Sequence, residues 1–275
     1  MTFVPRFLNS GWAGIHVCLL VMATLATTAN AQGFALSVSP PRFEVQIKAG
    51  ERIRQVLEIN NASDNPSKIK IKTADWTLAP DGSVIFEEAL LPGSCRPWVA
   101  LERLELVVPA KRPYRFRFEV AAPSDAIAAE CRFALLLEGE DQTVNAGSLA
   151  LPYNARLGVI VYAAVGNVAP RIEVIGSSVQ AINGKPTAVL KITNSGNAHG
   201  RLGGFLSGTD AAGVALEFSP TPSPILPGET RSIALMASKP GDSDTTASVT
   251  FPVTVTGKLE WGKNQSMALE QRFAP

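Results

Sequence analysis

The residues with the most suggestive types and spacing lie in Ser148–Tyr162, which reads SLALPYNARLGVIVY. Leu149, Leu151 and Tyr153 recur at every second position, and Arg156 follows them. This spacing predicts one long β-strand with an apolar face. The chemistry of such a strand is non-covalent: its backbone can pair with the sheet of another protein, with a fixed cation beside it. An interaction role is therefore predicted.

Signals for catalysis are weak. His199, the one histidine beyond the N-terminal segment, lies in the turn Asn197-Ala198-His199-Gly200 and is predicted to be solvated. One histidine without a nearby cysteine disfavours a zinc site. No Gly-x-Ser-x-Gly or Gly-Lys-Ser/Thr motif is present, and the acidic pair Glu87 and Glu88 is predicted to be solvated surface. The sequence predicts a protein that is not an enzyme, without catalytic residues, metal or cofactor.

The N-terminus has the pattern of an export signal. Arg6 precedes an apolar stretch from Trp12 to Leu25, and Ala29-Asn30-Ala31 has the small-x-small form of a cleavage site. We predict a signal peptide over residues 1–31, cleaved before Gln32; the alternative is an uncleaved anchor. The remaining 244 residues carry 24 basic and 24 acidic side chains. This balance gives no electrostatic case for nucleic acid.

Two cysteines, Cys95 and Cys131, follow the predicted signal peptide. Export would permit a disulfide between them. It would close a loop of about 36 residues and stabilise the fold by about 3–4 kcal/mol in the chain-entropy model. The alternative is two buried thiols.

Period-2 alternation runs through most of the chain after the N-terminal segment. Lys68–Lys72 and Tyr114–Val120 alternate without interruption, which predicts one face on a core and one in water. The other predicted strands of the first half are Leu36–Ile47, Arg52–Asn60, Ser83–Phe86, Trp98–Val108 and Glu130–Leu137. Short strands with no helical period predict an antiparallel β-sandwich over residues 32–166.

Asn167-Val168-Ala169-Pro170 predicts a short hinge. Residues 167–275 are predicted to form a second β domain. Its predicted strands are Ala188–Thr193, Arg201–Leu206, Val214–Phe218, Arg231–Met236 and Ala247–Leu259. The predicted fold class is therefore all-β, with two antiparallel sandwich domains after a signal peptide.

The order of several short motifs resembles the N-terminal domain of periplasmic pilus (fimbrial) chaperones. The resemblance covers roughly residues 36–162. It rests on Ser39-Pro40-Pro41-Arg42, Ala49-Gly50-Glu51, Asn60, Asp75-Trp76, Asp81-Gly82, Trp98, Pro123 and Cys131, in that order.

This resemblance implies two immunoglobulin-like domains that hold pilus subunits in the periplasm. Its implied partners are exported pilus or fimbrial subunits and an outer-membrane usher. The last strand of the first domain would complete the subunit's sheet, with Leu149, Leu151 and Tyr153 in the subunit groove. Two basic residues would bind the subunit's C-terminal carboxylate, and the first of them corresponds to Arg42.

The second basic position departs from the family pattern, because alignment of the last strand places Gly158 there. Arg156 lies two residues earlier, on the same face of a strand and about 7 Å away. We expect Arg156 to substitute, or the carboxylate clamp to be weaker.

Simpler interpretations remain open at this point. Leu149 and Leu151 could face their own domain's core, and Arg42 and Arg156 could be surface residues paired with Glu44 or Glu58. The alternative function is a non-catalytic structural or adhesive module of the cell envelope.

Overall fold

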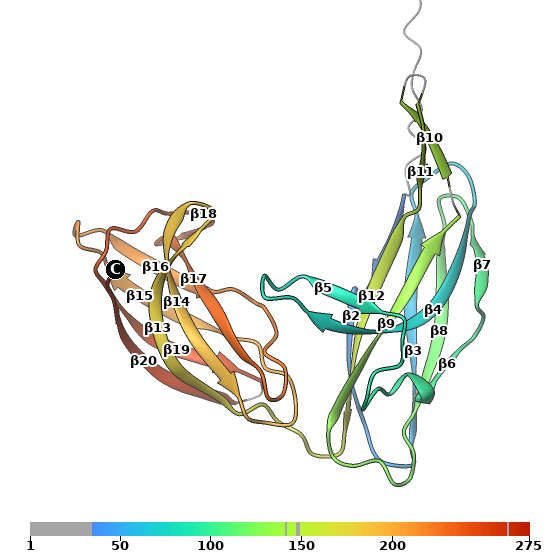
Figure 1. Cartoon of the computed structure of the whole chain (residues 1–275), viewed down its shortest axis with the longest axis horizontal. Coiled ribbons are helices and arrows are strands. Elements are labelled where there is room, and N and C mark those ends of the chain that lie inside the picture. Colours follow the sequence, from blue (N-terminus) through green and yellow to red (C-terminus); the bar gives the residue numbers. More distant parts are fainter. Residues whose placement is uncertain (1–34, 141, 147–148, 263) are drawn as a thin grey trace, which may run out of the picture. The chain divides into compact units, whose positions relative to one another are not determined.

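The computed structural model describes residues 35–140, 142–146, 149–262 and 264–275 (Figure 1). The predicted signal peptide, residues 1–31, lies outside the described residues. Within them, the one regular element that is not a strand is the 3-10 turn η1 (Arg96–Trp98). The predicted all-β fold class is confirmed. No helix of the described residues has the length and apolar character needed to span a membrane.

The strands of the first group form two facing sheets and a separate hairpin. One sheet has the order β1-β3-β8-β6, the other β2-β12-β9-β4-β5 with β7 beside β4, and β10 pairs with β11. Their bounds are β1 (Leu36–Ser39), β2 (Arg42–Ile47), β3 (Arg52–Asn61), β4 (Ser67–Leu78), β5 (Val84–Glu87), β6 (Val99–Leu101), β7 (Glu105–Val108), β8 (Pro113–Ala121), β9 (Glu130–Gly139), β10 (Gln142–Ala146), β11 (Leu149–Tyr153) and β12 (Arg156–Val165).

Aromatic side chains join the two sheets of this group. Phe118 of β8 meets Phe43 of β2 edge to face, with ring centroids 5.2 Å apart. It also meets Phe133 of β9, at 6.4 Å. All three rings are buried, so alternate apolar residues of both sheets fill one sandwich core.

Two predicted strands of this group are interrupted. Leu36–Ile47 divides at Pro40 and Pro41: β1 pairs with β3 antiparallel, and β2 pairs with β12 in parallel. Prolines lack the N–H that a ladder requires, so the change of sheet falls there. Trp98–Val108 divides into the end of η1 and the short strands β6 and β7.

The prediction of one continuous strand over Ser148–Tyr162 is wrong. The structure has β11 and β12, separated at Asn154 and Ala155. At this break the backbone N–H of Gly139 donates to the Ala155 carbonyl at 3.0 Å. The side-chain amide of Asn154 donates to the Gly139 carbonyl at 3.2 Å. Thus the regular ladder between β9 and β12 ends, and the hairpin of β10 and β11 begins.

The second group of strands forms one curled sheet, with the order β13-β14-β17-β16-β15-β19-β20 and with β18 beside β17. Ile172 at one end and Phe273 at the other belong to the same buried cluster, so the sheet wraps around a single core. The prediction missed β13, β18 and β20. The bounds are β13 (Ile172–Ile182), β14 (Lys185–Asn194), β15 (Gly203–Thr209), β16 (Ala215–Pro220), β17 (Thr230–Lys239), β18 (Asp242–Thr246), β19 (Val253–Trp261) and β20 (Gln265–Phe273).

The strands of the two groups pair only within their own group among the described residues. The division into domains over residues 32–166 and 167–275 stays a prediction.

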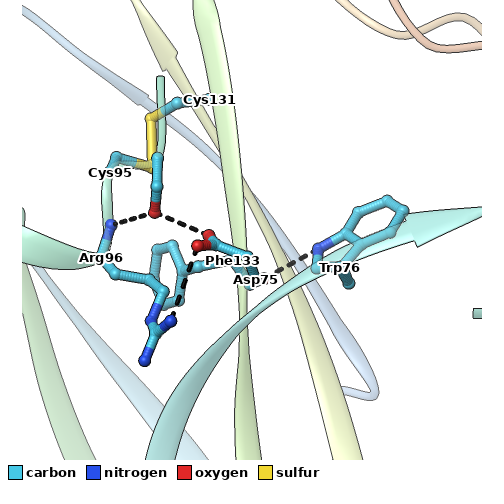
Figure 2. The surroundings of a disulfide bond; sticks show 7 residues. Asp75, Trp76, Cys95, Arg96, Cys131 and Phe133 are labelled. Carbon is cyan, nitrogen blue, oxygen red and sulfur yellow. Dashed lines mark hydrogen bonds and ion pairs between the residues drawn. A yellow bond between two sulfur atoms is a disulfide. The ribbon is translucent and has the colours of Figure 1, made fainter. Parts of the chain in front are cut away.

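Cys95 and Cys131 form a disulfide, with Cα atoms 5.8 Å apart, as the first alternative predicted (Figure 2). It joins the loop before η1 to β9. The same loop is held to β4 by the buried carboxylate of Asp75, which accepts hydrogen bonds from the Leu91 N–H at 2.8 Å and the Ser94 hydroxyl at 2.6 Å. The Arg96 guanidinium lies 3.6 Å from that carboxylate.

Candidate functional site

One face of the sheet β2-β12-β9-β4-β5 carries the predicted arginines. Along β2 the odd-numbered residues are buried and the even-numbered residues are exposed. Arg42 and Ile160 are register partners in the parallel ladder of β2 and β12, and so are Glu44 and Tyr162. Period 2 puts Arg156 on the same face of β12 as Ile160 and Tyr162. We call this surface the outer face, because the opposite face lies on the sandwich core.

The pairing register leaves part of β12 with an open edge. β2 begins at Arg42, opposite Ile160, and continues to Val165 of β12. Residues 156–159 pair with β9 on one side and, among the described strands, with none on the other. β11 likewise pairs only with β10. An added strand along β11 and the start of β12 would therefore run in line with β2 and meet it at Arg42.

Arg42 and Arg156 are not brought together. Arg156 is four residues before the register partner of Arg42, roughly 13 Å along the strand. Arg42 Nε lies 2.8 Å from Glu44 Oε1, and both side chains are about half exposed. The first interpretation left open for Arg42, a surface pair with Glu44, thus describes its contact in this structure.

Arg156 belongs to a network of two bases and two acids. Its guanidinium lies 2.6 Å from Glu138 and 3.9 Å from Glu88. The Lys72 ammonium lies 2.7 Å from Glu88 and 3.1 Å from Glu138. The hydrogen bond with Glu88 raises the pKa of Lys72, and the same contact lowers the pKa of Glu88. Arg156 is therefore ion-paired in this structure, as Arg42 is, and its role in carboxylate binding stays a prediction.

Leu149, Leu151 and Tyr153, the predicted groove-binding residues, lie on β11. The structure describes the backbone of this strand, and their side chains lie outside the described part. Their groove-binding role stays a prediction.

Gly158 occupies the position where the resemblance implied a basic residue. A Cβ at Gly158 would lie 2.3 Å from Cζ of the Phe86 ring, so the ring of β5 lies directly on this glycine. The outer face here is packed, and a lysine at this position would have to displace Phe86.

We expect Gly158→Lys to lower the free energy of unfolding by about 1–3 kcal/mol, because it overpacks this contact. Urea denaturation followed by circular dichroism measures the change. Phe86→Ala combined with Gly158→Lys should cost less than the two single changes added together. If the stability losses of the two single variants add up to the loss in the double variant, the side chains at positions 86 and 158 do not clash.

Tyr162 is the centre of a buried aromatic group on the outer face. Its ring meets Trp76 edge to face, with centroids 5.5 Å apart. The His199 ring stacks on it at 3.8 Å, with planes 21° apart. Burial raises the pKa of Tyr162 to about 12. The hydroxyl therefore stays protonated and accepts a 3.1 Å hydrogen bond from Arg201.

The prediction that His199 is a solvated turn residue is wrong. Its side chain is 9% exposed, and Nδ1 lies 2.8 Å from Glu130 Oε2. Its backbone N–H donates to the other oxygen of Glu130 at 3.0 Å, and Nε2 lies 3.6 Å from Glu44. The turn that carries His199 also bonds to the start of β9, since the Glu130 N–H donates to the Asn197 carbonyl at 3.0 Å. Contacts between residues about 70 positions apart thus bury this histidine.

Sequence reasoning missed Tyr162, His199 and Arg201 as members of this site. The alternation of β12 could have identified Tyr162, since it follows Arg156 at an even spacing. No local pattern identifies the other two, which come from the second group of strands.

No protein-family model matches the chain, and no curated protein matches it. Solved structures to which it is similar include fimbrial chaperones. The Class 5 fimbriae chaperone CfaA is 14% identical, with 87% of this chain and 99% of that chain covered and a TM-score of 0.46. The YadV chaperone is 12% identical, with 86% of this chain and 99% of that chain covered and a TM-score of 0.45. A third similar structure is CsuC–CsuE, a chaperone–tip adhesion subunit complex of Acinetobacter baumannii. The matched chain is 13% identical, with 87% of this chain and 98% of that chain covered and a TM-score of 0.42. At these identities and TM-scores, the similarities by themselves establish neither the fold nor the function of this chain.

Proposed function

We propose that the chain is an exported, periplasmic chaperone that binds pilus (fimbrial) subunits by lending them a strand. The subunit's exposed strand edge pairs along β11 and the start of β12, and its C-terminal carboxylate meets Arg42. The observation that carries the proposal is the open edge of residues 156–159, which stops where β2 begins at Arg42. The order of sequence motifs supports pilus subunits as the client class.

Strand addition matches the needs of such a client. A subunit that lacks a strand exposes backbone donors, acceptors and an apolar groove, and would aggregate. Pairing with β11 satisfies the backbone groups, and the alternating Leu149, Leu151 and Tyr153 fill the groove. Burial of three such side chains contributes at most about 5–9 kcal/mol before ordering costs.

Co-purification from the periplasm, with mass spectrometry of the bound proteins, tests the proposal. A stable complex with an exported, otherwise insoluble pilus subunit is the expected result. Recovery of the chain at the cell surface, accessible to external protease and free of such a subunit, would favour a structural or adhesive envelope module instead.

Arg42→Ala is expected to weaken the subunit complex about ten- to a hundredfold, because a charge-assisted contact with a carboxylate contributes about 1.5–3 kcal/mol. Competition binding with purified complex measures the change. Arg54→Ala is the matched control: Arg54 Nε lies 2.8 Å from Glu119, the same separation as in the pair of Arg42 with Glu44, but on β3 of the other sheet. Equal losses of subunit affinity in the two variants would show that Arg42 has no specific role in binding.

A further inference from the structure

The hairpin of β4 and β5 crosses the outer face above the start of β12 (Figure 1). β4 pairs with β9 as far as Ala74, and from Asp75 onward it pairs with β5. The hairpin thereby leaves the ladder of the sheet, and Phe86 of β5 packs against a buried cluster that includes Leu136 of β9 and Tyr162 of β12. An aromatic ring is thus carried over strands with which β5 does not pair.

The Phe86 ring takes the place of the side chain that Gly158 lacks. The three atoms nearest to a Cβ at Gly158 all belong to this ring, at 2.3, 3.0 and 3.1 Å. A glycine inside a strand has no side chain to pack, and an aromatic ring laid over it compensates for this loss. The outer face at residue 158 is therefore apolar, although β12 itself has a glycine there.

The ring lies beside the open edge of β12. Residues 156–159 pair with β9 on one side and, among the described strands, with none on the other. A strand added at that edge would lie about 5 Å from β12, and directly opposite residues of neighbouring strands share a face. The residue opposite Gly158 would then have its Cβ about 5 Å from the tip of the Phe86 ring. Phe86 is only partly buried, so such a neighbour would cover apolar surface that is now in water.

The apolar contact is limited to one position of the added strand. Two residues before Gly158 on the same face is Arg156, which is paired with Glu138 at 2.6 Å. Two residues after it is Ile160, where β2 begins at Arg42 and closes the edge. The added strand therefore meets the ring within its last few residues, next to the end that reaches Arg42.

We propose that Phe86 is a specificity-determining residue of the strand-binding edge, and that it selects a large apolar side chain opposite Gly158. The inference rests on the proposed function, since the added strand is the subunit strand that ends at Arg42. The partner is a C-terminal strand with leucine, isoleucine or phenylalanine at this position, because the contact removes apolar surface of both side chains from water. A carboxylate at the same position would lose its hydration against the ring.

Peptide binding to the mature protein tests this selection. The probe is the tightest binder from a library of ten-residue peptides with alternating apolar residues and a free C-terminal carboxylate. Each of its last four residues is replaced in turn by leucine and by alanine, and fluorescence anisotropy gives the dissociation constant of every peptide. In the wild type, leucine should be favoured about five- to tenfold at the position opposite the glycine. Phe86→Ala should lower that ratio below twofold and leave the ratios at the other positions unchanged.

Two further variants separate selection from support of the fold. Ile85→Ala is the matched control: Ile85 is the neighbouring apolar residue of β5, is 47% exposed, and belongs to the other set of the alternation. It should leave all ratios unchanged. Phe86→Ala combined with Gly158→Val returns a side chain to the place of the ring, so the preference for leucine should recover.

The outcomes distinguish the inference from the proposed function. If Phe86→Ala weakens every peptide alike, the ring only supports the hairpin, and the inference is overturned while the proposed function stands. A preference that does not recover in the double variant overturns it as well. Phe86→Leu, which keeps a smaller apolar side chain, should lower the ratio about twofold, and it serves if Phe86→Ala does not fold. If no peptide in the library binds the wild type, strand addition itself is overturned.

Discussion

Replacement of Leu149 and Leu151 by glutamate is expected to abolish the complex with the subunit. The two leucines supply most of the apolar surface that β11 offers, and two carboxylates in a groove would face a desolvation cost of several kcal/mol each. Capture of the co-expressed subunit from periplasmic extract, quantified by mass spectrometry, measures the effect. The variant should keep the melting temperature of the wild type, because β11 pairs only with β10 among the described strands.

Ala150→Glu is the matched control for this prediction. Ala150 lies between the two leucines and belongs to the other set of the alternation, so period 2 assigns it to the opposite face. This variant should retain the subunit. Loss of the complex in Ala150→Glu would show that any charge on the strand is harmful, and retention in the double variant would overturn the role of the leucines.

These estimates rank the parts of the binding surface. The strand offers at most about 5–9 kcal/mol of apolar burial, against about 1.5–3 kcal/mol for a carboxylate contact. We therefore expect the leucines to dominate affinity. In the proposed complex, Arg42 would act at one point, where the added strand ends, and would set its register.

Removal of the disulfide, with Cys95→Ala and Cys131→Ala together, should lower the free energy of unfolding by about 3–4 kcal/mol. The bond closes a loop that spans 36 positions in the sequence, and its loss frees the unfolded chain. A domain of this size is typically stable by about 5–15 kcal/mol. The variant should therefore fold but unfold at a clearly lower urea concentration, which tryptophan fluorescence reports, since Trp76 is buried in the folded protein.

Reduction of the wild type provides the comparison. Reduced wild type and the double alanine variant should have similar urea midpoints if loop closure is the main effect. If the variant is much less stable than the reduced wild type, the extra loss of stability comes from altered packing around Cys95, which is fully buried. An unchanged midpoint in both would contradict a stabilising disulfide.

The sequence predicted those features that are encoded over a few residues. The alternation in Tyr114–Val120 corresponds to β8, in which Phe116, Phe118 and Val120 are buried. The sequence did not predict β13 and β20. In both strands, small and polar residues interrupt the apolar alternation, so the period-2 pattern is weak. The break at Asn154 was missed because it depends on a hydrogen bond to Gly139 of another strand.

By itself the sequence determined the all-β class, the positions of most strands in the first group, the cysteines able to pair and the alternating strand at Leu149. These follow from spacing along the chain, since side-chain alternation is a local property of a strand. Only the tertiary structure decided which edge of β12 stays open, because that depends on where β2 joins it. The same is true of the neighbours of Tyr162. Contacts between distant segments place Trp76, His199 and Arg201 around its ring.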